Sequence, residues 1–399
     1  MNWSFVKPIK MKFLFLSFAA MLLTLCFANT QAQSSANTEN VFIITIDGFR
    51  WQELFNGADE AILGNPQYVK DITLARQLFW DSTALLRRKK MMPFLWNVIA
   101  ANGQVYGNRS LGNKDDVTNW YKISYPGYNE MLTGYADPFF IPNLPVNNRN
   151  ISVLEYLNKT KRYADKIVAF TSWNIFPYIF NEKRSRLPLN SGYSRLEETD
   201  GDMTNKNIND VQSGIAHKKN TRYDMLTYLS TKEYIAVHHP KIVFLGLGET
   251  DEFAHEGRYD LYLQQASNID RMISELWYFV QTDPFYKNNT TFVITTDHGR
   301  GSNPFSWVTH GIFTKGSSDI WLAVMGPDIL PLGEMKNNEQ IYEKQLAPTI
   351  AMLVGENFSP LHSTVKNAVL PIDLNNPDRT VGRDRQTAIY TKTNFFSSK

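Results

Sequence analysis

The stretch "VFIITIDGFRW", residues 41–51, indicates the kind of sheet that this chain builds. Its first residues are apolar or β-branched on both faces, and they lead directly to Asp47 and Gly48. A strand without a polar face is typical of a parallel sheet that helices cover on both sides. Asp47 is then either a turn residue that ends a buried strand or part of an active site, and this stretch alone leaves both interpretations open.

Further apolar runs and helical patterns extend this picture along the chain. Buried parallel strands are also expected in residues 241–251, 290–299, 319–329 and 165–173. Apolar residues recur at helical spacing in 258–282 and in 343–355, where Gly355 is a stop signal. We therefore predict an α/β fold with a doubly wound, mostly parallel sheet and helices on both faces.

Two polar segments interrupt this alternation of strands and helices. Residues 135–150 are rich in Pro and Asn, and residues 181–220 are rich in turn-forming residues. A structureless loop of about 40 residues is unusual inside a compact domain. We therefore predict a cap or insertion over about 135–222, near a site, within a single domain that spans 33–399.

The charge balance argues against a nucleic-acid-binding protein. The 399 residues carry a formal net charge of +2, but the first 32 contain three lysines and no acid. The remainder has 38 basic and 39 acidic residues, which gives no global basic field for nucleic acid or an anionic membrane. The cluster "RRKK" at 87–90 is interpreted as a solvated helix face, with an anion-steering patch as the alternative.

Residues 1–32 have the pattern of a signal peptide. A lysine-bearing segment precedes the apolar run 13–28, and "TQA" at 30–32 offers small residues before the expected cleavage point. We predict export to the periplasm or medium, with Met1 or Met11 as the start and no stable span in the mature chain; a membrane anchor or lipidation at Cys26 is the alternative. Cys26 is the only cysteine, so the mature chain has no disulfide and no thiolate ligand.

Three of the seven histidines follow the predicted strands together with carboxylates. "DEFAH" places Asp251 and His255 one helical turn apart, so that an oxygen and an imidazole can converge on one ion. Asp297 and His298 follow a buried strand directly, and His310 lies twelve residues later. Because ligands bind at the carboxyl ends of parallel strands, this arrangement favours a metal site that includes Asp47.

Ser124 is the candidate nucleophile. In "KISYPGYNEMLTG", residues 122–134, Pro126 suits the first turn of a helix, which places Ser124 at or just before its N-cap. Ser124 is then a capping residue, or it is a nucleophile. The positive end of the helix dipole and free N–H groups favour an alkoxide and a phosphate oxygen at such a position.

The order of these motifs resembles the alkaline phosphatase superfamily, in particular its type I phosphodiesterase/nucleotide pyrophosphatase branch, over roughly residues 40–355. The resemblance implies two divalent ions, usually zinc, with manganese as the alternative. One ion would be held by Asp47, Asp297, His298 and the Ser124 oxygen, and the other by Asp251, His255 and His310. It implies an exported phosphoric ester hydrolase for mono- or diesters, with a phosphoserine formed on Ser124.

The chain departs from that branch after the nucleophile. Gly127 and Tyr128 replace the usual Asn-His, and Glu130 lies where neutral residues are common. The superfamily has an Asn that contacts a phosphate oxygen, and Asn147 and Asn148 are the candidates for it here. Arg184, Arg186 and Asn190 are candidate phosphate or substrate contacts from the cap, with a solvated loop as the alternative.

Other functions on the same fold remain alternatives. A sulfatase would use a Ser-x-Pro-x-Arg stretch, but Tyr128 occupies the Arg position here. A phosphoglycerate mutase has similar ligands, and a non-catalytic binding protein could keep the fold. The sequence leaves open whether the substrate is a monoester or a diester, which leaving group it carries, and the oligomeric state.

Overall fold

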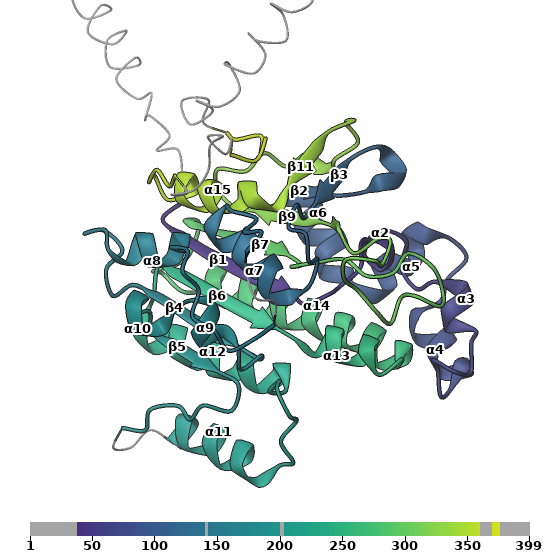
Figure 1. Cartoon of the computed structure of the whole chain (residues 1–399), viewed down its shortest axis with the longest axis horizontal. Helices are drawn as coiled ribbons and strands as arrows, with labels where there is room; N and C mark the ends of the chain where they lie inside the picture. The colour runs from purple at the N-terminus through teal and green to yellow at the C-terminus, as the bar shows by residue number, and fades with distance from the viewer. Residues whose placement is uncertain (1–37, 140–142, 200–202, 360–368, 376–399) are drawn as a thin grey trace, which may run out of the picture. The chain divides into compact units, whose positions relative to one another are not determined.

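Eight strands form the central sheet of the computed structural model, in the order β10-β2-β9-β7-β1-β6-β4-β5 (Figure 1). The structure describes residues 38–139, 143–199, 203–359 and 369–375, so the predicted signal peptide lies outside the described residues. The strands are β1 (Asn40–Ile46), β2 (Gly103–Tyr106), β4 (Ile167–Thr171), β5 (Leu189–Ser191), β6 (Ile242–Leu247), β7 (Thr290–Thr295), β9 (Leu322–Met325) and β10 (Gly333–Glu334). β1 lies between β6 and β7 and runs parallel to both, which matches the predicted doubly wound sheet.

Strand β9 departs from the expected parallel arrangement. It was predicted within 319–329 as a parallel strand, but it runs antiparallel to both β7 and β2. The chain between β7 and β9 contains no helix that could carry it back across the sheet, so the strand returns in the opposite direction. The short strand β8 (Asp319–Ile320) instead joins β3 (Lys114–Asp116) and β11 (Gln340–Tyr342) in a second, three-stranded sheet.

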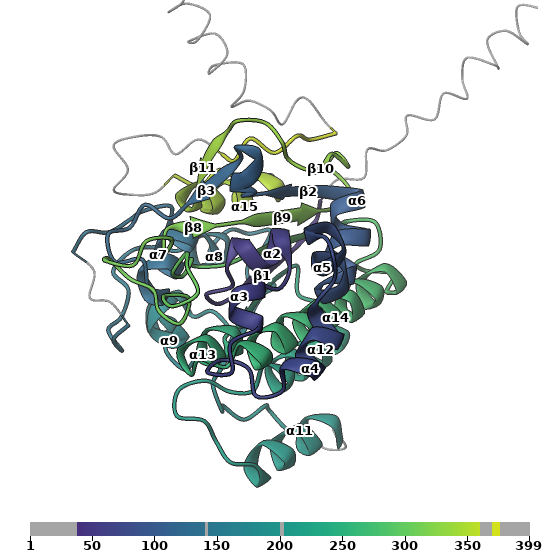
Figure 2. The ribbon, with the colours of Figure 1, turned by 90° about the vertical axis from the view of Figure 1, so that its right-hand side faces the viewer.

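Helices cover both faces of the central sheet, as predicted. One group contains α2 (Trp51–Asn56), α5 (Ala84–Met91) and α14 (Tyr259–Thr282), and Figure 2 shows α14 beside α5. The other contains α7 (Ser124–Thr133), α8 (Val153–Asn158) and α15 (Leu346–Leu353), with α15 packed against α7 and α8. The helical patterns at 258–282 and 343–355 therefore correspond to α14 and α15, although α15 begins later than expected because residues 343–345 form a 3-10 turn.

The region 135–222 is not separate from the sheet. It contributes the strands β4 and β5, and its polar part contains α10 (Glu182–Ser185) and α11 (Met203–Gly214). Helix α11 contacts α12 (Asp224–His238) and lies at the lower edge of Figure 1, away from the central strands. The buried parallel strand predicted at 165–173 is confirmed as β4, which pairs with β6.

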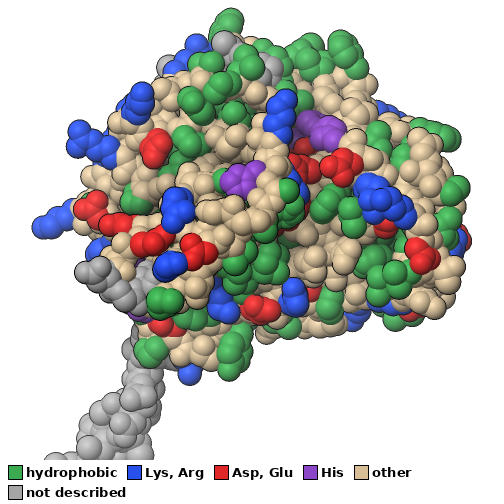
Figure 3. Space-filling view, turned by 90° about the horizontal axis from the view of Figure 1, so that it is seen from below, with side chains coloured by type: hydrophobic (Ala, Val, Ile, Leu, Met, Phe, Trp, Pro, Cys, Tyr) green, Lys and Arg blue, Asp and Glu red, His purple; other side chains and the backbone are tan. Residues whose placement is uncertain are grey.

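The basic cluster at 87–90 is partly packed rather than solvated. The guanidinium of Arg88 lies 3.6 Å from the ring centroid of Trp96 and donates two hydrogen bonds to Glu334. Arg87 lies over the ring of Trp80. The two arginines of the cluster therefore interact with other parts of the fold. On the face that Figure 3 shows, basic and acidic side chains are interspersed.

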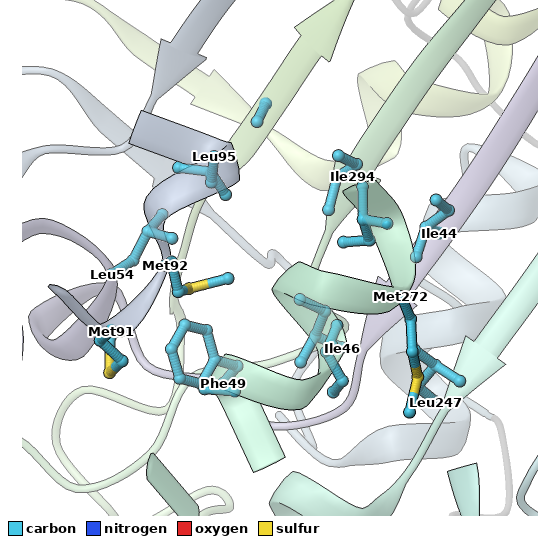
Figure 4. Packing of buried hydrophobic residues seen from close by; sticks show 14 of the residues in the cluster. Ile44, Ile46, Phe49, Leu54, Met91, Met92, Leu95, Leu247, Met272 and Ile294 are labelled. Atoms are coloured by element: carbon cyan, nitrogen blue, oxygen red, sulfur yellow. The ribbon is translucent and has the colours of Figure 1, made fainter. Parts of the chain in front are cut away.

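Residues of β1 alternate between two hydrophobic clusters. Ile44 and Ile46 pack with Leu247 and Met272 on one side of the sheet, as Figure 4 shows. Val41 and Ile43 belong to the cluster on the other side. Because successive side chains of a strand point to opposite faces, burial of both sets explains why the run at 41–46 has no polar face.

The buried carboxyl group of Asp115 in β3 should make the free energy of unfolding depend on pH. Burial raises the pKa of Asp115 to about 8, with a further contribution from Asp116. An unfolded Asp titrates near 3.9, so between about pH 4 and 8 the folded state binds the extra proton and stability falls as pH rises, by at most about 1.4 kcal/mol per pH unit. We expect the stability of Asp115→Asn relative to the wild type to increase across this window and to level off above it.

Urea unfolding at pH 5, 6.5 and 8 measures this difference in the free energy of unfolding. Asp116→Asn is the second variant: because Asp116 contributes to the raised pKa of Asp115, its removal should reduce the same pH dependence, but by less than Asp115→Asn does. A difference between Asp115→Asn and the wild type that does not change with pH would contradict the expectation.

Candidate metal centre

The three carboxylates singled out in the sequence meet at one edge of the sheet. Asp47 follows β1, Asp297 follows β7, and Asp251 lies in α13 (Glu249–His255), directly after β6. These strands are neighbours and parallel, so their carboxyl ends lie side by side. The turn after β1 requires Gly48: its φ is +59°, and a Cβ there would lie 2.7 Å from Asp251 Oδ1.

Asp47, Asp297 and His298 form the first cluster of ligand atoms. All three side chains are buried, and His298 Nε2 lies 3.5 Å from Asp47 Oδ1 and 3.5 Å from Asp297 Oδ2. His298 Nδ1 is 2.9 Å from the carbonyl oxygen of Gly299, to which it donates, so the lone pair of Nε2 faces the carboxylates. Burial lowers the pKa of His298 to about 4, which keeps the imidazole neutral.

Asp251, His255 and His310 form the second cluster. His255 Nε2 lies 3.0 Å from His310 Nε2 and 3.3 Å from Asp251 Oδ2. His310 Nε2 lies 3.6 Å from Asp251 Oδ1, and His310 Nδ1 is 3.3 Å from the Lys122 carbonyl oxygen. Histidine and acidic side chains lie next to each other on the face shown in Figure 3. The spacing "DEFAH" therefore does bring both side chains to one point, as one helical turn predicts.

The first cluster contains buried oxygen atoms that a cation would satisfy. Asp47 Oδ1 and Asp297 Oδ2 have no hydrogen-bond partner among the described residues, although both are buried. Burial is the largest cause that raises the pKa of both Asp47 and Asp297. Repulsion from Asp297 and Asp251 adds to it at Asp47, and repulsion from Asp251 adds to it at Asp297. A buried carboxylate without a partner is strongly unfavourable, and a divalent ion offsets this cost. The donors of the two clusters, oxygen together with imidazole nitrogen, fit divalent metal ions such as zinc.

Ser124 lies beside the first cluster at the start of α7. It is the first residue of the helix, after Ile123 at the N-cap, and its Oγ is 3.2 Å from His298 Nε2. The backbone N–H of Tyr125 donates to Asn143 Oδ1 at 2.9 Å. The N-terminus of the helix therefore faces the clusters, which is the arrangement that favours an anionic group.

Gly127 lets α7 approach β7 closely enough to bring Ser124 to the cluster. A Cβ on Gly127 would lie 2.2 Å from the Asp297 carbonyl oxygen. We expect Gly127→Ala to lower the free energy of unfolding by about 1–3 kcal/mol, because the helix or the strand end must move. Gly214→Ala is the matched control, since that position has open space around it and should be close to neutral. Urea unfolding of both variants tests this, and equal stabilities would contradict it.

Tyr128 supports the first cluster from α7. Its hydroxyl donates to Asp47 Oδ2 at 3.1 Å in a fully buried position. We expect Tyr128→Phe to weaken zinc binding about ten- to a hundredfold, because the carboxylate loses the bond that orients it. Tyr125→Phe is the control, since that hydroxyl donates to the carbonyl of Val146, away from the cluster. Competition with a chelator measures both affinities, and similar effects of the two substitutions would argue against this role.

A pocket of about 800 Å³ opens onto both clusters. Ser124, Asp47, Asp251 and His255 lie in its wall, and Trp173 and Tyr178 form an aromatic part of the lining. Its amide-bearing residues are Asn143, Asn174 and Asn220.

The substrate contacts predicted from the cap lie elsewhere. Asn147, Asn148, Arg184, Arg186 and Asn190 are not among the described residues that line this pocket. Arg184 pairs with the buried Glu155 and donates to the Asn148 and Asn150 carbonyls, and Asn190 Oδ1 accepts from Arg222. The side-chain hydrogen bonds of Asn148, Arg184 and Asn190 join parts of the fold, and substrate contact at the five predicted positions stays a prediction.

Sequence reasoning missed three residues that contact the clusters or their surroundings. Tyr128 was noted only as a departure from the branch pattern, and Asn143 lies four and five residues before the candidates Asn147 and Asn148. Arg300, two residues after His298, contacts Asp251 through Nη1. Its proximity to "DH" was the only available signal, because the pairing joins residues 49 positions apart.

Comparisons with known proteins agree with this arrangement. A family model described as the Metalloenzyme superfamily matches residues 193–356, which include Asp251, His255, Asp297, His298 and His310. The lipoteichoic acid synthase LtaP from Listeria monocytogenes is 12% identical, with 84% of this chain and 74% of that chain covered and a TM-score of 0.52. Wild-type alkaline phosphatase PafA is 9% identical, with 81% and 96% covered and a TM-score of 0.52. A search of curated proteins gives no match.

At these identities the structural likeness establishes the fold. The chain has the mostly parallel α/β fold of the alkaline phosphatase superfamily, as the order of its motifs predicted. On this fold lie two clusters of acidic and histidine side chains that could hold metal ions. None of the helices in the described residues has the length and hydropathy that a membrane span needs.

Proposed function

We propose that this chain is an exported hydrolase of phosphoric esters that uses two divalent ions, in which Ser124 is the nucleophile. The position of Ser124 carries the proposal. Its Oγ lies at the N-terminus of α7, 3.2 Å from His298 Nε2, in the wall of a pocket that Asp251 and His255 also line. A serine that only capped a helix would not need to adjoin two groups of metal-ligating side chains.

The residues of the clusters divide into two ligand sets. Asp47, Asp297, His298 and Ser124 Oγ would hold one ion, and Asp251, His255 and His310 would hold the other. When bound, the ions would supply Lewis-acid stabilisation of the attacking and leaving oxygens. Zinc suits these donors, with manganese as the alternative.

The chain's own residues would orient the reaction. The Ser124 oxygen would form a bond to phosphorus while the bond to the leaving oxygen breaks on the opposite side, and water would then release phosphate and restore Ser124. The N-terminus of α7 favours the negative charge that develops there. Asn143, which accepts from the Tyr125 N–H, would donate through its side-chain amide to a phosphate oxygen.

Hydrolysis of three model esters tests the proposal. The mature protein is assayed on p-nitrophenyl phosphate, on bis(p-nitrophenyl) phosphate and on p-nitrophenyl sulfate, with and without a chelator. We expect turnover of at least one phosphate ester, its loss with chelator and its return with zinc or manganese. Hydrolysis of the sulfate alone would favour the sulfatase alternative. No hydrolysis by protein that holds two equivalents of metal would favour a non-catalytic binding protein.

A further inference from the structure

The two clusters differ in their net charge. The first contains two carboxylates, Asp47 and Asp297, whose described hydrogen-bond donors, the Tyr128 hydroxyl and the Gly48 N–H, are neutral. The second contains one carboxylate, Asp251, which is in contact with the guanidinium of Arg300. When the carboxyl groups are ionised, as the binding of an ion requires, the carboxylates and Arg300 sum to a charge of about −2 at the first cluster and about 0 at the second.

Arg300 is held in place beside the second cluster. Its side chain is fully buried, Nε donates to the Trp307 carbonyl at 2.8 Å, and Nη2 donates to the Val308 carbonyl at 2.6 Å. An arginine does not lose its proton in a protein, so its charge cannot be removed when an ion arrives. The buried bonds also oppose a movement of the guanidinium away from Asp251, because its donors would lose their partners.

The hydrogen bonds of the histidines also make the first cluster the readier one to bind an ion. Arg300 Nη2 lies 3.3 Å from His255 Nδ1, and arginine can only donate, so this nitrogen accepts. The His255 proton is then on Nε2 and can be donated to His310 Nε2 at 3.0 Å, while His310 Nδ1 donates to the Lys122 carbonyl. His255 must shift this proton before Nε2 can bind an ion, whereas the Nε2 lone pair of His298 already faces its carboxylates.

We propose that Arg300 makes the second site the weaker one, so that two divalent ions bind in a set order. The first ion occupies the site of Asp47, Asp297 and His298, and the second occupies the site of Asp251, His255 and His310. A fixed positive charge in contact with Asp251 repels an incoming dication at the second site. Arg300 also acts on Asp47 and His298 of the first site, but among the described residues it makes no hydrogen bond or ion pair to either, so its effect there is smaller. Arg300 is thus a residue that sets metal affinity and positions Asp251, independent of the reaction that the protein catalyses.

Calorimetric titration of the metal-free protein with zinc tests the order. We expect two steps whose dissociation constants differ by at least about tenfold. His310→Ala should remove the weaker step and Asp297→Asn the tighter one. Arg300→Gln should strengthen the weaker step by at least about tenfold and the tighter step by less, because Arg300 is in direct contact with Asp251 only. Arg300→Lys, which keeps the charge, should preserve the gap.

The titrations test the order of binding and the role of Arg300 separately. Equal affinities in the wild type, or loss of the tighter step in His310→Ala, would overturn the proposed order. A weaker second step in folded Arg300→Gln would show that Arg300 only orients Asp251, which would overturn its assigned role. If Arg300→Gln does not fold by circular dichroism, Arg300→Met and the wild-type titration with the two ligand variants still decide the question. These measurements of binding do not depend on turnover.

Discussion

Ser124→Ala is expected to lower kcat/KM for phosphate esters by at least about a thousandfold. The substitution removes the oxygen that would bond to phosphorus, and the helix terminus and the metal ligands stay in place. Because three protein ligands remain for each ion, we expect the variant to hold both zinc ions. Its fold should also persist, since Ser124 is the first residue of α7 and alanine is favourable in a helix.

Parallel measurements separate loss of the nucleophile from loss of the site. Steady-state kinetics on a phosphate ester are combined with metal content and with thermal unfolding of the same preparation. Ser124→Thr is the matched control, because it restores a hydroxyl at the same position and should recover part of the activity. Unchanged turnover in Ser124→Ala would remove Ser124 from the mechanism, and loss of metal along with turnover would assign it a ligand role only.

Asp297→Asn is expected to weaken the tighter zinc site by at least about a hundredfold, and yet to stabilise the metal-free protein. In the absence of an ion, Asp297 and Asp47 are two buried carboxyl groups with unpaired oxygens beside one another. Removing one of these charges relieves repulsion and desolvation, so the free energy of unfolding should rise by about 1–3 kcal/mol without metal. With zinc present the sign should reverse, because the wild type gains the binding energy of the ion.

The control for this prediction is a buried aspartate with satisfied oxygens. Asp270 accepts hydrogen bonds from the backbone N–H groups of Phe94 and Leu95, both at 2.8 Å. Asp270→Asn should therefore destabilise the protein with and without zinc and leave metal binding unchanged. Urea unfolding of both variants in chelator and in zinc compares the signs. If metal-free Asp297→Asn were less stable than the wild type, Asp297 would not be a strained ligand.

The local pattern of the sequence predicted the central strands and the acidic and histidine side chains that meet at their ends. Apolar runs at 41–46, 242–247 and 290–295 lack a polar face, which only a sheet buried on both sides explains. Carboxylates directly after such runs must lie at one edge when the strands are parallel neighbours. The spacing of Asp251 and His255 likewise specifies a common helix face, because one turn contains 3.6 residues.

Features that depend on contacts between distant segments were not predicted. The direction of β9 depends on the helix-free connection that precedes it, and the pairing of Arg184 with the buried Glu155 joins residues 29 positions apart. Arg50, left unassigned beside Asp47, pairs with Glu53 and donates to the Gly301 carbonyl. A charged residue in a sequence shows that it needs a partner, but not which partner the packing supplies.

The sequence by itself determined the strand-ending carboxylates, the histidines and the serine at the start of a Pro-containing helix. Each of these depends on residue type and short spacing, which local backbone geometry converts into position. Only the tertiary structure decided that Gly127 lets α7 contact the Asp297 carbonyl, that Tyr128 bonds to Asp47, and that Arg300 neutralises Asp251. The physical reason is that these contacts join different elements, so they depend on how the elements pack and not on the order of residues within any of them.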